Sequence, residues 1–96
     1  MAQDVAAPAH SIDSILDQLD RFHQRVTYGA VAKLVGRAPR NLMSGRERDA
    51  RSSWIVSRDS GLPTGYKPEQ MHSQLTEREE ILGTAEELEV WLANPA

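Results

Sequence analysis

The apolar positions of residues 12–24 recur every three or four residues, which predicts an amphipathic helix. Ser11 directly precedes this segment and suits the N-cap, because a serine hydroxyl accepts a hydrogen bond from an unpaired backbone N–H of the first turn. We expect the apolar side to pack on the next helix and the acidic side to face solvent. The apolar positions are Ile12, Ile15, Leu16, Leu19 and Phe22, and the acidic ones are Asp13, Asp17 and Asp20.

A second apolar face, over residues 28–35, predicts another helix with Thr27 as its cap and Gly36 at its end. Pro39 suits the opening turn of a third helix, at about residues 38–48. A helix, a tight turn and a helix form the helix-turn-helix pattern of many DNA-binding proteins. The outer face of the third helix would carry Arg40, Asn41 and Ser44, while Leu42 and Met43 turn inward.

Residues 53–57 are rich in β-branched and aromatic side chains and are short, which predicts a strand. Residues 59–66 contain two glycines and a proline, which favours a turn. A second short strand around Tyr66 would complete a β-hairpin. A helix-turn-helix followed by a hairpin describes a winged helix, although a plain helical bundle with a loop fits the apolar pattern equally well.

From Pro68 onward the chain is acidic and helical in composition until Gly83 interrupts it. Thr84 and Glu87 form a capping-box pattern at the start of a last helix. We therefore expect a mainly α fold with a small β-hairpin, winged helix-turn-helix-like, with residues 11–94 as one domain after a flexible leader of residues 1–10. The last helix would bury Leu88, Trp91 and Leu92.

Composition is that of an ordinary globular chain: 96 residues, 40% hydrophobic and 26% charged. No apolar run is long enough to span a bilayer, and the first ten residues lack the pattern of a secretion signal, so we expect a cytoplasmic protein. The absence of cysteine excludes disulfides and thiolate chemistry.

The charge is unevenly distributed. Residues 21–51 contain eight basic and two acidic residues, whereas the remainder contains three basic and twelve acidic residues. Although the net charge is −3, this distribution predicts one basic face on an acidic body, which is the electrostatic pattern of a nucleic-acid-binding surface.

Residues 26–32 read VTYGAVA, and residues 34–36 read LVG. This stretch resembles the C-terminal DNA-binding domain of O6-alkylguanine-DNA alkyltransferases, and more closely the alkyltransferase-like proteins, which lack the acceptor cysteine. The resemblance covers roughly residues 11–60. It implies that the partner is duplex DNA and that Tyr28 helps to rotate a target nucleotide out of the stack.

The segment that aligns with the family's active-site strand departs from the family pattern. That strand reads Pro-Cys-His-Arg-Val in the family, whereas residues 51–56 read RSSWIV here. One alignment places Ser52 at the cysteine position and another places Trp54 there, and neither keeps the family's histidine and arginine. Counting from Tyr28, the family's intercalating arginine falls on Leu42, and Arg40 replaces it only across a short gap.

Catalysis is not expected, because a serine nucleophile needs a nearby base and His10, His23 and His72 are widely separated in the sequence. Neither a metal site nor a cofactor site shows a recognisable spacing. Trp54 and Trp91 fit core positions better than base-stacking platforms, whereas the resemblance favours a DNA-facing Tyr28.

The sequence thus predicts a non-catalytic domain that docks residues 38–48 on duplex DNA. One alternative is a protein-interaction module that uses its acidic helices and has no DNA role. Another is a sensor of O6-alkylguanine in DNA repair, with Ser52 and Trp54 in its base pocket. Oligomeric state stays open. The expected DNA contacts are Thr27, Tyr28, Arg37, Arg40, Asn41, Ser44, Arg46 and Arg48.

Overall fold

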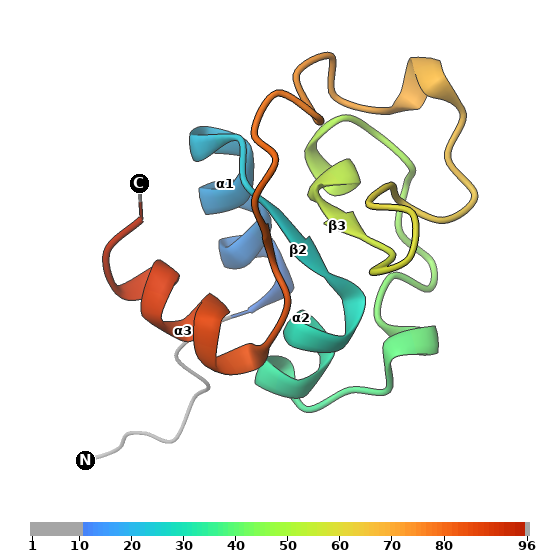
Figure 1. Ribbon diagram of the computed structural model, residues 1–96. Helices are drawn as coiled ribbons and strands as arrows, with labels where there is room; N and C mark the ends of the chain where they lie inside the picture. Colours follow the sequence, from blue (N-terminus) through green and yellow to red (C-terminus); the bar gives the residue numbers. More distant parts are fainter. Residues whose placement is uncertain (1–10, 96) are drawn as a thin grey trace.

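The computed structural model of the chain describes residues 11–95, so the expected flexible leader at residues 1–10 lies outside the described residues. Three helices pack beside a small parallel sheet, which makes the fold α/β (Figure 1). The helices are α1 (Ile12–Phe22), α2 (Tyr28–Val35) and α3 (Ala85–Ala93), and the strands are β2 (Arg25–Thr27), β3 (Ile55–Val56) and β4 (Ile81–Leu82).

The three predicted helices with clear caps are confirmed. Ser11 and Ser14 cap each other's backbone N–H at the start of α1, and the Thr27 hydroxyl accepts a hydrogen bond from the N–H of Ala30 at the start of α2. Thr84 and Glu87 form the predicted capping box of α3. Because each signal acts within one turn, the sequence alone was sufficient to place these helices.

The prediction of a β-hairpin is wrong. β2 is the central strand and pairs in parallel with β3 on one side and with β4 on the other, with Val26 opposite both Ile55 and Leu82. Residues 57–62 instead form a turn, in which the N–H of Ser57 donates to the Leu62 carbonyl. Strand pairing to β2 is favoured because Val26, Ile55 and Leu82 are all buried there.

The predicted third helix at residues 38–48 is not formed. Only a 3₁₀ turn, Pro39–Asn41, occurs in this segment, followed by further turns and a second 3₁₀ turn, Arg51–Trp54. Leu42 is buried as expected. Residues 44–50 offer only Ala50 as an apolar side chain, so a continued helix would gain almost no packing to offset its ordering.

Residues 68–82 also differ from the expected helix, because they contain a 3₁₀ turn (Pro68–Gln70), an irregular segment and β4. The extended path before β4 is fixed by side chains next to β2. The Gln24 amide donates to the Glu80 carbonyl at 2.9 Å, and the Arg25 guanidinium donates to the Arg78 carbonyl at 2.8 Å. These bonds satisfy part-buried backbone carbonyls that a helix would have paired internally.

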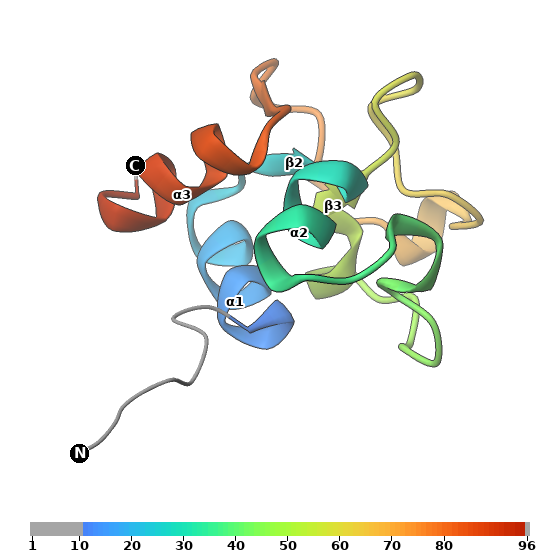
Figure 2. The ribbon, with the colours of Figure 1, turned by 90° about the horizontal axis from the view of Figure 1, so that it is seen from below.

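The molecule has a regular side and an irregular side. In Figures 1 and 2 the three helices lie toward one side of the sheet region, and the segments 37–50 and 57–77 lie toward the other. Trp54 is fully buried in the core and its indole N–H donates to Asp20, whereas Trp91 is half-buried at the edge of the core. None of the helices in residues 11–95 is long and apolar enough to cross a membrane.

Candidate nucleic-acid interface

The start of α2 and the two irregular segments border two adjoining hollows of about 440 and 540 Å³. We call them together the basic cleft, because their lining contains three arginines and lacks aspartate and glutamate. Tyr28 and Arg48 are common to both hollows. The residues that line the basic cleft are Tyr28, Pro39, Arg40, Met43, Ser44, Gly45, Arg46, Arg48, Thr64 and Tyr66.

Tyr28 holds one wall of the basic cleft in place. It is the first residue of α2 and half-buried, and its hydroxyl oxygen accepts a hydrogen bond of 2.8 Å from the backbone N–H of Thr64. The same hydroxyl still has a hydrogen to donate. The phenol therefore fastens the 57–66 turn to α2 while keeping a donor available for a ligand.

Arg48 lies against Gly65 of the same turn. A Cβ atom at Gly65 would stand 3.3 Å from the Arg48 Nη2 atom, and the Gly65 backbone has a φ of +77°. The left-handed backbone favours glycine, and a side chain here would also make the Arg48 guanidinium shift by a few tenths of an ångström. The lack of a side chain at Gly65 therefore leaves room for the guanidinium of Arg48, which is exposed to solvent.

Tyr66 is the second aromatic residue that lines the basic cleft, and it is half-buried. Burial raises the pKa of its phenol, and the neighbouring Tyr28 and Asp49 act in the same direction, whereas the Ser52 side chain and the charge of Arg48 oppose them. A phenol with a raised pKa is neutral at physiological pH. Tyr66 therefore presents an uncharged hydrogen-bonding group next to Arg48.

The arginines of residues 37–51 divide into two groups. Arg46 makes a two-pronged ion pair with Asp13 at 3.0 and 3.3 Å, and Arg51 pairs with Asp17 at 2.8 Å. In contrast, no carboxylate of the described residues lies within 4.0 Å of a second group of arginines. This second group consists of Arg37, Arg40 and Arg48.

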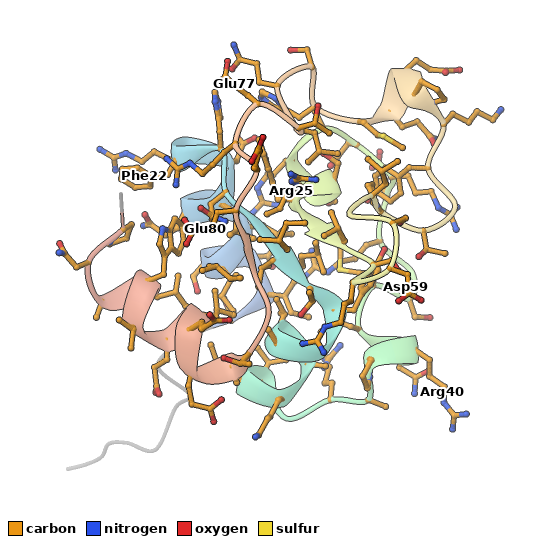
Figure 3. All side chains as sticks on the ribbon, in the orientation of Figure 1. Phe22, Arg25, Arg40, Asp59, Glu77 and Glu80 are labelled. Atoms are coloured by element: carbon orange, nitrogen blue, oxygen red, sulfur yellow. The ribbon has the colours of Figure 1, made fainter. Side chains whose placement is uncertain are left out.

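Other residues predicted to contact DNA lie outside the basic cleft. Thr27 is 4% exposed, and its hydroxyl caps α2 and donates to the Gly83 carbonyl. Arg37 and Asn41 are exposed beside the hollows but line neither of them. Arg40 points outward from the irregular side of the molecule (Figure 3). The structure thus brings together Tyr28, Arg40, Ser44, Arg46 and Arg48.

The two residues predicted for a base pocket are both buried. Ser52 is 5% exposed and lies behind Tyr66, with which its side chain interacts. Trp54 is fully buried; its ring stacks on His23, and its indole N–H donates to Asp20. Neither residue lines the hollows.

Sequence reasoning missed Thr64 and Tyr66 as cleft residues, because it assigned that segment to a hairpin. The pair of glycines at positions 61 and 65 was the available signal, since both have a positive φ and reverse the chain toward α2. No group of three or more histidine, aspartate and glutamate side chains in residues 11–95 has the geometry of a metal site.

No protein-family model, curated protein or solved structure matches this chain. The basis for a functional inference is therefore the chemistry of the basic cleft.

Proposed function

We propose that the protein binds duplex DNA in the basic cleft and does not catalyse a reaction on it, as the resemblance of residues 26–32 to the alkyltransferase-like proteins implies. The observation that carries this proposal is the pair Arg40 and Arg48. Both guanidinium groups line a cleft beside Tyr28, and no carboxylate of the described residues pairs with either. A surface of this kind, on a chain of net charge −3, favours an anionic partner.

The chemistry of the cleft matches a nucleic-acid backbone. Guanidinium groups bind phosphate through parallel N–H···O bonds, and the exposed hydroxyls of Ser44 and Thr64 add neutral donors beside them. Tyr28 and Met43 give the same cleft an apolar surface for a sugar or a base. Because the segment that carries Arg40 and Arg48 is made of turns rather than a helix, we expect contacts to the DNA phosphates to outnumber contacts to the base edges.

A binding role without catalysis fits the positions of the reactive groups. Ser52 and Trp54, which the two alignments place at the position of the acceptor cysteine, are both buried, and the Ser52 side chain interacts with Tyr66. His23 and His72 lie around Trp54, each within about 5.4 Å between ring centroids, and are absent from the cleft lining. A serine without an adjacent base is a poor nucleophile.

The test is a fluorescence anisotropy titration of a labelled duplex at about 50 and 200 mM salt, with the chain and two double variants. Arg40→Ala with Arg48→Ala is expected to weaken binding at least about tenfold and to reduce the salt dependence by roughly two counterions. Arg46→Ala with Arg51→Ala removes the same charge from the α1-paired group and is expected to weaken binding much less. Thermal melting verifies that both variants are folded.

Equal losses for the two double variants would mean that only net charge matters, and absence of binding by the unmodified chain would overturn the proposal outright. A second duplex that contains one O6-methylguanine separates plain binding from lesion sensing. A clear preference for this duplex would favour the sensor, which needs a base to rotate into the hollow beside Tyr28.

A further inference from the structure

A second surface lies on the side of the molecule opposite the basic cleft. A shallow groove of about 540 Å³ runs between β4 and α3, and we call it the α3 groove. In Figure 3, Glu80 of this groove and Arg40 of the basic cleft lie on opposite sides of the ribbon. The residues that line the α3 groove are Glu80, Leu82, Glu86, Glu87, Val90, Trp91 and Asn94.

The floor of the α3 groove is apolar. Val90 is 73% exposed, and among the described residues the only other exposed large hydrophobic side chain is Leu62, at 36%. Leu88 on the inner side of α3 is fully buried, so the helix is already anchored to the core without Val90. Val90 and the half-buried Trp91 leave an apolar strip open to water above the buried Leu82, which favours covering the strip with a ligand.

The rim of the α3 groove is acidic and partly fixed in position. One carboxylate oxygen of Glu87 accepts from the backbone N–H of Gly83 at 2.9 Å and of Thr84 at 3.1 Å. Glu86 forms only a loose, exposed pair with Lys33 at 3.6 Å. Glu80 is exposed, while the Gln24 amide holds its backbone carbonyl. Three carboxylates around an apolar strip complement a cationic ligand and repel phosphate.

We propose that the α3 groove binds a segment of a partner protein in which one large aliphatic side chain is flanked by lysine or arginine. The aliphatic side chain would lie against Val90 and Trp91, and the cations would pair with Glu80 and Glu86. This proposal goes beyond DNA binding and does not depend on it, because the two surfaces share no lining residue. Both ligands can therefore be bound at once.

The test uses the full chain labelled with ¹⁵N and three synthetic peptides of equal length. The first carries a leucine flanked by lysines, the second replaces these lysines with glutamates, and the third keeps the lysines but replaces leucine with serine. Saturable amide shifts confined to residues 80–94 are expected with the first peptide alone. Equal binding of the second peptide, or shifts outside the α3 groove, would overturn the proposal.

Two variants and a matched control locate the binding. Val90→Asp and Glu86→Lys are each expected to weaken binding of the first peptide about tenfold. Glu89→Lys makes the same charge change on the same helix but lies outside the groove lining, and is expected to retain most of the affinity. If Glu89→Lys weakens binding as much as Glu86→Lys does, net charge explains the result and the groove is not a site.

The occupant could instead be a second copy of this chain, which brings its own basic residues. Sedimentation of the chain at increasing concentration separates the two cases. A monomer is expected at every concentration. A dimer that Val90→Asp dissociates would overturn the proposal that the groove binds a segment of a different protein. Val90→Asp should leave DNA affinity unchanged, so failure of either proposal is seen separately.

Discussion

Two arginines lie against the same turn, residues 57–66, with opposite surroundings. Arg25 approaches from the inside, where its Nη1 atom would be 3.1 Å from a Cβ at Gly61 and donates to the Gly61 carbonyl at 2.8 Å. Arg48 approaches from the cleft, where its Nη2 atom would be 3.3 Å from a Cβ at Gly65. Arg25 is 7% exposed, whereas Arg48 is open to solvent.

The difference between Arg25 and Arg48 shows that the role of an arginine, structural or ligand-binding, follows from the groups that surround it and not from its residue type. Arg25 bonds two backbone carbonyls, those of Gly61 and Arg78, and no carboxylate of the described residues pairs with it. Burial lowers its pKa, and its Nε atom has no hydrogen-bond partner. Arg25 therefore ties the turn and the approach to β4 onto β2, whereas the charge of Arg48 is left for a ligand.

Arg25→Met tests the structural side of this comparison and should have the largest effect. It removes two charge-assisted hydrogen bonds and leaves buried carbonyls unpaired, so the free energy of unfolding should fall by about 3 kcal/mol. Arg48→Met is the matched control and should change stability by less than about 0.5 kcal/mol. Urea denaturation followed by tryptophan fluorescence measures both. Comparable losses would show that Arg48 is also structural, and would remove the contrast.

Gly65→Ala tests the functional side, because the alanine Cβ crowds Arg48 and its backbone must keep a φ of +77°. Stability should fall by roughly 1 kcal/mol. DNA affinity should also fall, since the guanidinium is displaced from the cleft wall. Gly29→Ala in α2 is the control: its Cβ would meet nothing within 4 Å, so stability should be unchanged or slightly raised. Equal effects at both glycines in calorimetry and DNA titration would contradict the proposed role of Gly65.

The same contrast explains which parts of the fold could be predicted from sequence. Each helix was found from a cap and an apolar period within one segment, as at Ser11 and Thr84. β2 and β4 were missed because their pairing joins Val26 to Leu82, far apart in the chain, and strands of two or three residues show no alternation. The third predicted helix is not formed because residues 44–50, over which it would have to continue, offer only Ala50 as an apolar side chain.

For the candidate site, the sequence predicted several of the cleft residues. It did not predict which arginines pair with carboxylates, nor the cleft residues that come from residues 57–66. Arg40 and Arg48 were predicted from local charge. That Arg46 would instead pair with Asp13, 33 positions earlier, depends on how the irregular segment folds back on α1. Thr64 joins the cleft only because Arg25 and Tyr28 fasten the turn from two sides.

Asp13→Asn tests the role of Arg46, which lines the cleft like Arg48 but is paired with a carboxylate, that of Asp13. The hydrogen bond and charge of Arg46, together with Arg51, lower the pKa of Asp13 below its usual value of 3.8. A lowered pKa in the folded state contributes stability above that value and loses it as pH falls through the folded-state pKa. The variant should therefore melt slightly below the unmodified chain from about pH 5 to 8, and the difference should vanish in stronger acid. Because the substitution releases Arg46 toward the cleft, DNA affinity at neutral pH should rise by about threefold. An unchanged affinity would show that Arg46 adds no DNA contact even when it is released from Asp13, so that only Arg40 and Arg48 belong to the binding surface.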